Sequence, residues 1–200
     1  MKKTLCIILM AAMVISIMAG LTACGSPGTP VNVVIVDGNA RANSASFSYN
    51  LPAISNLLNR AAHNGFVGQV SVEGVPRETA SYTISKPHKT GLTQTKLDDI
   101  ARSNQATVTA TLQSLEVTTG EADVLKALQM GARLVQANHQ DSSEDYLIIL
   151  DSMLPTEGVL DFTASNLLDA DPEMIVEALR AYGEIPVLDG MSVIVFERSC

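Results

Sequence analysis

Residues 31–37, Val-Asn-Val-Val-Ile-Val-Asp, decide the fold of this chain. The nearly continuous β-branched run Val31–Val36 ends at Asp37-Gly38. A strand with one solvent-facing side alternates apolar and polar residues, whereas a strand in the centre of a parallel sheet is apolar throughout. We therefore predict a buried, central strand of the parallel type.

A second run of this kind, Tyr146–Leu150, is also followed by an acid, Asp151. Between and after the two runs, the sequence predicts a loop over 39–50, a helix from Pro52 to about Asn64, a hairpin of strands over 66–73 and 79–85, a helix over 121–138, a loop over 152–170, a helix from Pro172 to Tyr182 and a strand over 191–196. Residues 94–115 have mostly helical spacing, but the alternation of Thr107–Thr111 favours a strand, and both interpretations remain open.

This order of elements predicts an α/β fold: a three-layer, mostly parallel, Rossmann-like sheet with helices on both faces. One such domain is expected over residues 31–200, a length that suffices for a single core. Ligands of such sheets bind beyond the carboxyl ends of the strands, which is where Asp37 and Asp151 stand.

The N-terminus has the pattern of an export signal, because Lys2 and Lys3 precede an apolar run that ends at Leu21-Thr22-Ala23-Cys24. This pattern resembles a bacterial lipoprotein signal with Leu21–Cys24 as the lipobox. The resemblance implies that residues 1–23 are a signal peptide that is removed, and that Cys24 then carries lipid, with acyl chains such as palmitate. An uncleaved transmembrane helix is the alternative, and it also places the following domain on the extracytoplasmic face.

Residues 24–30 would then be a lipidated, flexible linker between the cell membrane and the domain. The whole chain has 13 Lys and Arg and 21 Asp and Glu, a formal charge of −8. Loss of Lys2 and Lys3 with the signal leaves 11 basic residues against 21 acidic ones, a charge of −10. Such a surface repels nucleic acid and anionic lipid headgroups, so we expect no nucleic-acid partner and attachment to the membrane through the N-terminal lipid.

The order of elements and the two strand-terminal acids resemble a von Willebrand factor type A domain. In that family, an Asp-x-Ser-x-Ser loop, a threonine and a later aspartate bind a metal ion that a carboxylate of the partner completes. The resemblance places Asp37 and Asp151 at metal positions, Asn39 and Arg41 at the two serine positions, and Thr119 near the threonine position. Because an arginine cannot ligate a cation, the resemblance implies a degenerate metal site, and Mg²⁺ or Ca²⁺ is the cofactor that it suggests.

Asp37 and Asp151 have a second explanation, in which they cap loops and pair with Arg41. The family's domain also continues with a helix, an edge strand and a last helix, whereas this chain ends at Cys200, so we expect a shortened domain. His63, His88 and His139 lie far apart in the sequence and are expected on the surface rather than in a metal site.

Two functional hypotheses follow. In the first, the chain is a binding module rather than an enzyme, and no residue is assigned as catalytic. It contacts a protein or cell-envelope partner through loops at the carboxyl ends of the strands, and the candidate residues are Asp37, Asn39, Arg41, Asn43, Ser44, Thr119, Asp151 and Ser152. The second hypothesis is a divalent-metal-dependent enzyme that uses Asp37, Asn39, Arg41 and Asp151 on a phosphorylated substrate. Residues 34–41 resemble the signature of cis-prenyltransferases, but those enzymes are cytosolic, and the tryptophan expected after the arginine is absent.

Overall fold

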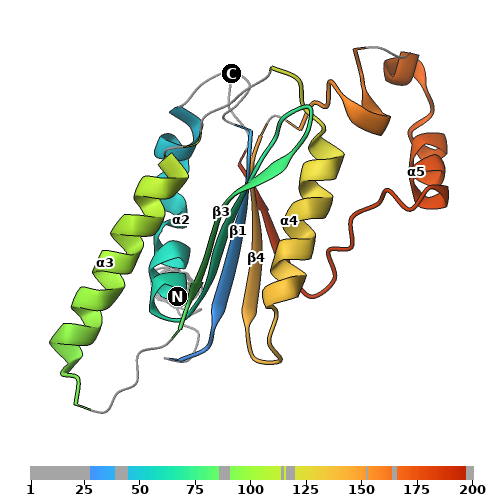
Figure 1. Cartoon of the computed structure of the whole chain (residues 1–200). Coiled ribbons are helices and arrows are strands. Elements are labelled where there is room, and N and C mark those ends of the chain that lie inside the picture. Colours follow the sequence, from blue (N-terminus) through green and yellow to red (C-terminus); the bar gives the residue numbers. More distant parts are fainter. Residues whose placement is uncertain are drawn as a thin grey trace, which may run out of the picture.

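The computed structural model describes residues 28–38, 45–85, 91–113, 115, 120–151, 153–163 and 166–196. These residues form a five-stranded sheet with helices against it (Figure 1). The strands are β1 (Val31–Asp37), β2 (Gly65–Ser71), β3 (Arg77–Ile84), β4 (Glu144–Leu150) and β5 (Ser192–Val195). The helices are α2 (Ala45–His63), α3 (Gln94–Gln113), α4 (Val124–Asn138) and α5 (Pro172–Ala181), with short 3-10 turns η2 (Gly158–Leu160) and η3 (Asn166–Asp169). In these ranges no helix is both long and apolar enough to cross a membrane.

The strand order is β3-β2-β1-β4-β5. Strand β1 pairs in parallel with β2 and β4, β4 pairs in parallel with β5, and β2 pairs antiparallel with β3. The predicted α/β class and the predicted hairpin are therefore confirmed, but the sheet as a whole is mixed. Its three parallel pairings are compatible with a Rossmann-like arrangement.

Strand β1 lies at the centre of the sheet, as its composition predicts, and all seven of its residues are buried. Its last residue, Asp37, is in register with Ser71 of β2 and with Leu150 of β4. The carboxyl ends of the three central strands therefore meet at one edge of the sheet, which we call the carboxyl edge.

Helices cover both faces of the sheet, as predicted. On one face α2 packs on β1 and β2, and α3 packs on α2 and β3, through buried side chains that include Ile54, Leu58 and Val108. On the other face α4 packs through Val124, Ala127 and Val135. Figure 1 shows this arrangement, with α2 and α3 on one side of the strands and α4 on the other.

Two expectations about helices are corrected. Helix α2 begins at Ala45, so the predicted loop over 39–50 is wrong from residue 45 onward, and Pro52 lies inside the helix rather than at its start. Residues 94–113 form one helix, α3, and the strand interpretation of Thr107–Thr111 is wrong. The threonines are accommodated in the helix, since the Oγ1 of Thr111 donates to the carbonyl of Thr107 at 3.1 Å. Val108 and Leu112, four residues apart, share the buried face.

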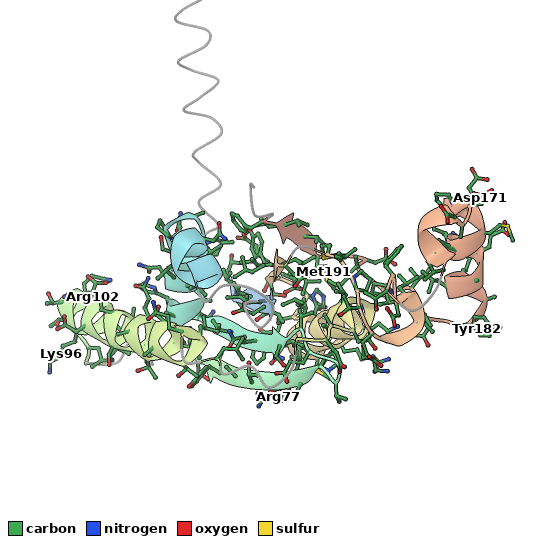
Figure 2. All side chains as sticks on the ribbon, turned by 90° about the horizontal axis from the view of Figure 1, so that it is seen from above. Arg77, Lys96, Arg102, Asp171, Tyr182 and Met191 are labelled. Atoms are coloured by element: carbon green, nitrogen blue, oxygen red, sulfur yellow. The ribbon has the colours of Figure 1, made fainter. Side chains whose placement is uncertain are left out.

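The segment after β4 contains short helical turns and one exposed helix. The predicted loop over 152–170 contains η2 and η3, and α5 follows with Pro172 in its first turn and Asp171 as its N-cap, the arrangement that the sequence predicts. None of the residues of α5, all of which the structure describes, is buried. Seen from above, α5 and its neighbours Asp171 and Tyr182 stand at the opposite end of the molecule from α3 (Figure 2).

Candidate functional site

Asp37 ends β1 opposite Leu150 of β4, Asp151 follows Leu150 at the carboxyl edge, and both acids are buried. The backbone N–H of Gly38 donates to the carbonyl of Leu150 at 2.8 Å, which holds the two strand ends together. A Cβ placed on Gly38 would lie only 1.8 Å from Oδ2 of Asp151. Only glycine therefore permits this close approach of the carboxylate to the backbone after β1.

The carboxylate of Asp37 is part of a buried polar network. Nε2 of Gln69, in β2, donates to Oδ2 of Asp37 at 2.9 Å and to the carbonyl of Leu112, in α3, at 3.1 Å. The hydroxyl of Thr79, in β3, donates to Oε1 of Gln69 at 3.0 Å. Gln69 thus connects Asp37 to the hairpin and to the end of α3. These hydrogen bonds compensate for the burial of the Gln69 amide.

The carboxylate of Asp151 caps its own loop. Its Oδ1 accepts the backbone N–H of Met153 at 2.6 Å, and Met153 has a positive φ of 58°. A left-handed conformation is unfavourable for a residue with a side chain, by about 1–2 kcal/mol, so the short hydrogen bond supports an otherwise costly turn. This contact is the loop-capping role that the second explanation assigns to Asp151.

The other candidates of this edge, Asn39, Arg41, Asn43, Ser44, Thr119 and Ser152, lie outside the described residues, as does Cys24. Within the described ranges, no three His, Cys, Asp or Glu side chains are grouped so that they could hold a metal ion. The carboxylates of Asp37 and Asp151 are ligands of the type that Mg²⁺ or Ca²⁺ prefers, and the other candidate ligands lie outside the described residues.

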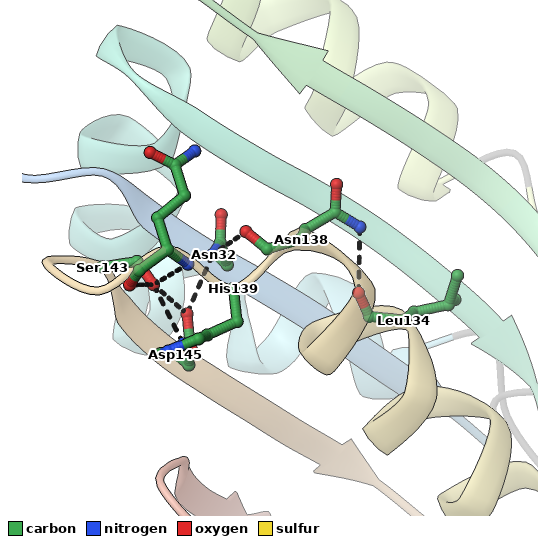
Figure 3. Close-up of polar contacts among 7 residues, drawn as sticks. Asn32, Leu134, Asn138, His139, Ser143 and Asp145 are labelled. Atoms are coloured by element: carbon green, nitrogen blue, oxygen red, sulfur yellow. Dashed lines mark hydrogen bonds and ion pairs between the residues drawn. The ribbon is translucent and has the colours of Figure 1, made fainter.

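A second polar cluster, which no sequence pattern indicates, lies at the opposite edge of the sheet, where β1 and β4 begin, and Figure 3 shows its contacts. Nδ1 of His139 lies 2.6 Å from Oδ2 of the buried Asp145. Oδ1 of Asp145 accepts bonds from Nδ2 of Asn32 at 2.8 Å and from Oγ of Ser143 at 2.9 Å. Nδ2 of Asn32 also donates to the carbonyl of Asn138 at 2.8 Å, so the cluster ties the α4–β4 turn to β1.

This combination of Ser, His and Asp does not have the geometry of a hydrolytic triad. Oγ of Ser143 lies 3.4 Å from Nδ1 of His139, which is the nitrogen that already contacts Asp145. In a hydrolase the serine and the aspartate contact opposite ring nitrogens, so that the histidine can carry a proton between substrate and nucleophile. We interpret the cluster as a structural contact that connects the α4–β4 turn to β1. His139, whose side chain is 51% exposed, and the exposed His63 lie on the surface as predicted, and His88 lies outside the described residues.

A third polar contact joins α2 to the start of β4. Arg60 pairs with Oε1 of Glu144, and the hydroxyl of Tyr146 donates to Oε2 of Glu144 at 2.8 Å. Partial burial alone would raise the pKa of Glu144, but the bonds from Arg60 and Tyr146 outweigh it and lower that pKa. Partial burial alone would lower the pKa of Arg60. The contacts with Glu144 and Tyr146 have the larger effect and raise that pKa. Burial and the neighbouring carboxylate raise the pKa of Tyr146.

Three comparisons with known proteins add little to this geometry. No family model matches the sequence, and no curated protein matches it. Among solved structures, the chain is similar to proximal thread matrix protein 1 from the mussel byssus, with 11% sequence identity and a TM-score of 0.44. That alignment covers 84% of this chain and 37% of the mussel protein. A likeness this distant carries no argument about function.

Proposed function

We propose that this chain is an extracytoplasmic lipoprotein, anchored in the cell membrane through Cys24, that binds a protein or cell-envelope partner through loops at its carboxyl edge. The observation that carries the proposal is the contact between the ends of β1 and β4, where Gly38 lets the carboxylate of Asp151 lie against the backbone beside Asp37. Open α/β sheets bind their ligands at such an edge. Loops at the end of a rigid sheet are common positions for binding residues.

The proposal includes a von Willebrand factor type A-like domain. The order of elements in the described residues is strand, helix, strand, strand, helix, helix, strand, helix, strand, leaving the 3-10 turns aside, and this is the order on which the resemblance rests. The position of Asp37 at the end of β1 and of Asp151 directly after β4 also supports it. A binding role is preferred to an enzymatic one because Asp37 and Asp151 already accept hydrogen bonds from Gln69 and from Met153.

Lipid attachment is tested by Cys24→Ser, with Cys200→Ser as the matched control. In a bacterial host that acylates lipoproteins, we expect the unchanged chain and the Cys200→Ser variant in the membrane fraction. The Cys24→Ser variant should lose its lipid mass, which is the deciding readout, because an uncleaved apolar run before residue 24 would by itself keep the chain in the membrane fraction. Lipid mass that persists in the Cys24→Ser variant would refute the anchor.

Partner binding is tested by replacing one residue at each edge of the sheet. Asn43→Arg alters the segment that connects β1 to α2, and Gln140→Arg makes the same change of charge in the α4–β4 turn. After crosslinking on membranes and mass spectrometry, we expect Asn43→Arg to lose the partner that Gln140→Arg retains. Equal recovery by both variants would contradict binding at the carboxyl edge.

A metal-dependent enzyme that uses Asp37, Asn39, Arg41 and Asp151 is the alternative, and a calorimetric titration with Mg²⁺ or Ca²⁺ separates it from metal-free binding. Saturable heat that Asp37→Asn removes would favour the metal site. If the site is a degenerate one, Arg41→Ser should increase the affinity, because it removes a cation from the segment after β1.

A further inference from the structure

A groove runs along the α5 side of the molecule, and its walls come from segments far apart in the sequence. One part, a cavity of about 260 Å³, lies between η2, η3 and α5 and is lined mainly by apolar side chains such as Leu160 and Met174. The other part, of about 310 Å³, lies between the β2–β3 turn at residues 74–76 and the first turn of α4. Val159 and Glu184 line both parts, so the two cavities are neighbours, and we call them together the groove.

Hydrogen bonds hold the walls of this groove in place. Nε2 of Gln129, a buried residue of α4, donates to the carbonyl of Glu184 at 2.7 Å and to its Oε2 at 2.8 Å. The backbone N–H of Ala122 donates to the hydroxyl of Thr156 at 3.0 Å, and the N–H of Thr156 donates to the carbonyl of Ala122 at 3.0 Å. The segment after α5 is therefore bonded to α4, and the segment before η2 is bonded to the residue two positions before α4, so these two walls of the groove are held in place.

The α5 part of the groove leaves large apolar side chains in contact with solvent. Met174 is 68% exposed, Tyr182 is 80% exposed and Val159 is 56% exposed. Contiguous apolar surface of this kind is typical of interaction sites. The volume lies below the range of about 300–1,000 Å³ that is usual for small-molecule pockets, so the part suits an anchor side chain of a larger partner.

The α4 part of the groove is acidic. Asp123 and Glu184 line it, with Lys126 as the basic residue among its lining side chains. Two more acids flank its floor: a Cβ placed on Gly74 would lie 3.0 Å from Oε2 of Glu121 and 3.8 Å from Cγ of Glu157. An excess of negative charge beside an apolar cavity favours a partner that carries a cation next to an apolar side chain. A second copy of this chain, with a formal charge of −8, or an anionic lipid surface would be repelled.

We propose that this groove binds an extended peptide segment of a partner protein, whose apolar side chain occupies the α5 part while a neighbouring lysine or arginine lies in the α4 part. This inference shares one assumption with the proposed function, namely that the chain is a binding module. It assigns a surface apart from the loop that follows Asp37, and it names the chemistry of the partner.

The test uses the full chain in a neutral detergent and a fluorescein-labelled peptide, Gly-Ser-Leu-Phe-Lys-Arg-Ser-Gly. One control peptide has Glu-Glu in place of Lys-Arg, and the other has Ser-Ser in place of Leu-Phe. By fluorescence anisotropy we expect saturable binding of the first peptide and at least about tenfold weaker binding of both controls, since each control removes one of the two contacts.

Two pairs of variants locate the site. Ala178 lines the cavity and Ala181, on the same helix, does not, so Ala178→Phe should weaken binding about tenfold while Ala181→Phe leaves it unchanged. Both alanines are exposed, so the helical circular dichroism should stay the same. Glu184→Gln should weaken binding about threefold, as expected for loss of a partly exposed charge, and Glu177→Gln on the outside of α5 should not.

Absence of saturable binding, or equal affinity for the acidic control peptide, would overturn the proposal. Equal effects of Ala178→Phe and Ala181→Phe would also overturn it. Concentration-dependent dimerisation that Ala178→Phe abolishes would show that the occupant is a second copy instead. None of these measurements depends on Cys24 or on the segment 39–44, so failure here is distinct from failure of the proposed function.

Discussion

The two edge strands of the sheet, β3 and β5, are protected to different degrees. Strand β3 carries Arg77 and Glu78, its pairing with β2 has an irregular register, and the hydroxyl of Tyr82 bonds to that of Thr111 in α3 at 2.7 Å. Strand β5 has four residues, none of them charged, and its Val195 is 46% exposed. Charges, bulges and a covering helix are the means by which proteins protect sheet edges, and β3 has all three.

The same contrast holds for the helices on either side. Helices α2, α3 and α4 each bury side chains in one of the two hydrophobic clusters of the sheet, whereas no residue of α5 is buried. Regions with few buried apolar contacts open at a lower free energy than the rest of a protein. The difference indicates that the β1–β4 centre supplies the stability and that the α5 end supplies accessible surface.

The largest expected effect compares one buried and one exposed side chain. Leu58 of α2 is fully buried, and Leu58→Ala should lower the free energy of unfolding by about 2–5 kcal/mol, because it leaves a cavity in the core. Met174 of α5 is 68% exposed, and Met174→Ala should change that free energy by less than about 0.5 kcal/mol. Urea unfolding followed by circular dichroism measures both. A similar cost for the two variants would mean that α5 packs on the sheet in solution.

A smaller effect distinguishes a contact between elements from one within a helix. Glu144→Gln should destabilise the protein by about 1 kcal/mol, because it weakens the half-buried link from α2 to β4. Asp99→Asn removes an exposed pair with Arg102, 2.6 Å long and local to α3, and should have almost no effect. Urea midpoints at pH 7 provide the comparison.

The pH dependence of that link has a definite sign. The pKa of Glu144 is lowered in the folded protein, so its contribution is complete above the ordinary glutamate pKa of about 4.3 and is lost as the pH falls through the lower folded value. The unchanged chain should therefore lose more stability than Glu144→Gln as the pH falls below the ordinary glutamate pKa of about 4.3. Parallel acid profiles of the two proteins would contradict the lowered pKa.

The centre of the fold could be predicted from the sequence because its residues have only one suitable environment. The apolar runs at Val31–Val36 and Tyr146–Leu150 fit the middle of a sheet, and parallel pairing then brings Asp37 and Asp151 to the same edge. The helix at α5 was also predictable, but its lack of packing was not, since its sequence resembles that of a helix that covers a sheet.

The remaining features depend on contacts that no local pattern encodes. Gln69 lies within a buried strand, and nothing in its neighbours indicates that it bonds to Asp37 and to the end of α3. Residues 107–111 alternate like a strand, and the burial of Val108 against α2 and the sheet decides for a helix. The groove combines the β2–β3 turn, α4, η2 and α5, so it becomes visible only in the folded chain.

The smallest expected effect on stability, and the most direct test of the contrast between the edges, is a lysine on each edge strand. Val195→Lys on β5 and Thr83→Lys on β3 both replace exposed residues and should change the free energy of unfolding by less than about 0.5 kcal/mol.

Their effects on self-association should nevertheless differ, because an edge lysine blocks strand-to-strand pairing only where the edge is otherwise unprotected. We expect the unchanged chain and Thr83→Lys to aggregate on heating and Val195→Lys to refold in larger yield, as measured by light scattering and by recovered circular dichroism. A high, reversible melting transition of the unchanged monomer would contradict this expectation. It would mean that β5, although short and uncharged, is already protected from strand pairing in solution. The β5 edge would then be no more prone to self-association than the β3 edge.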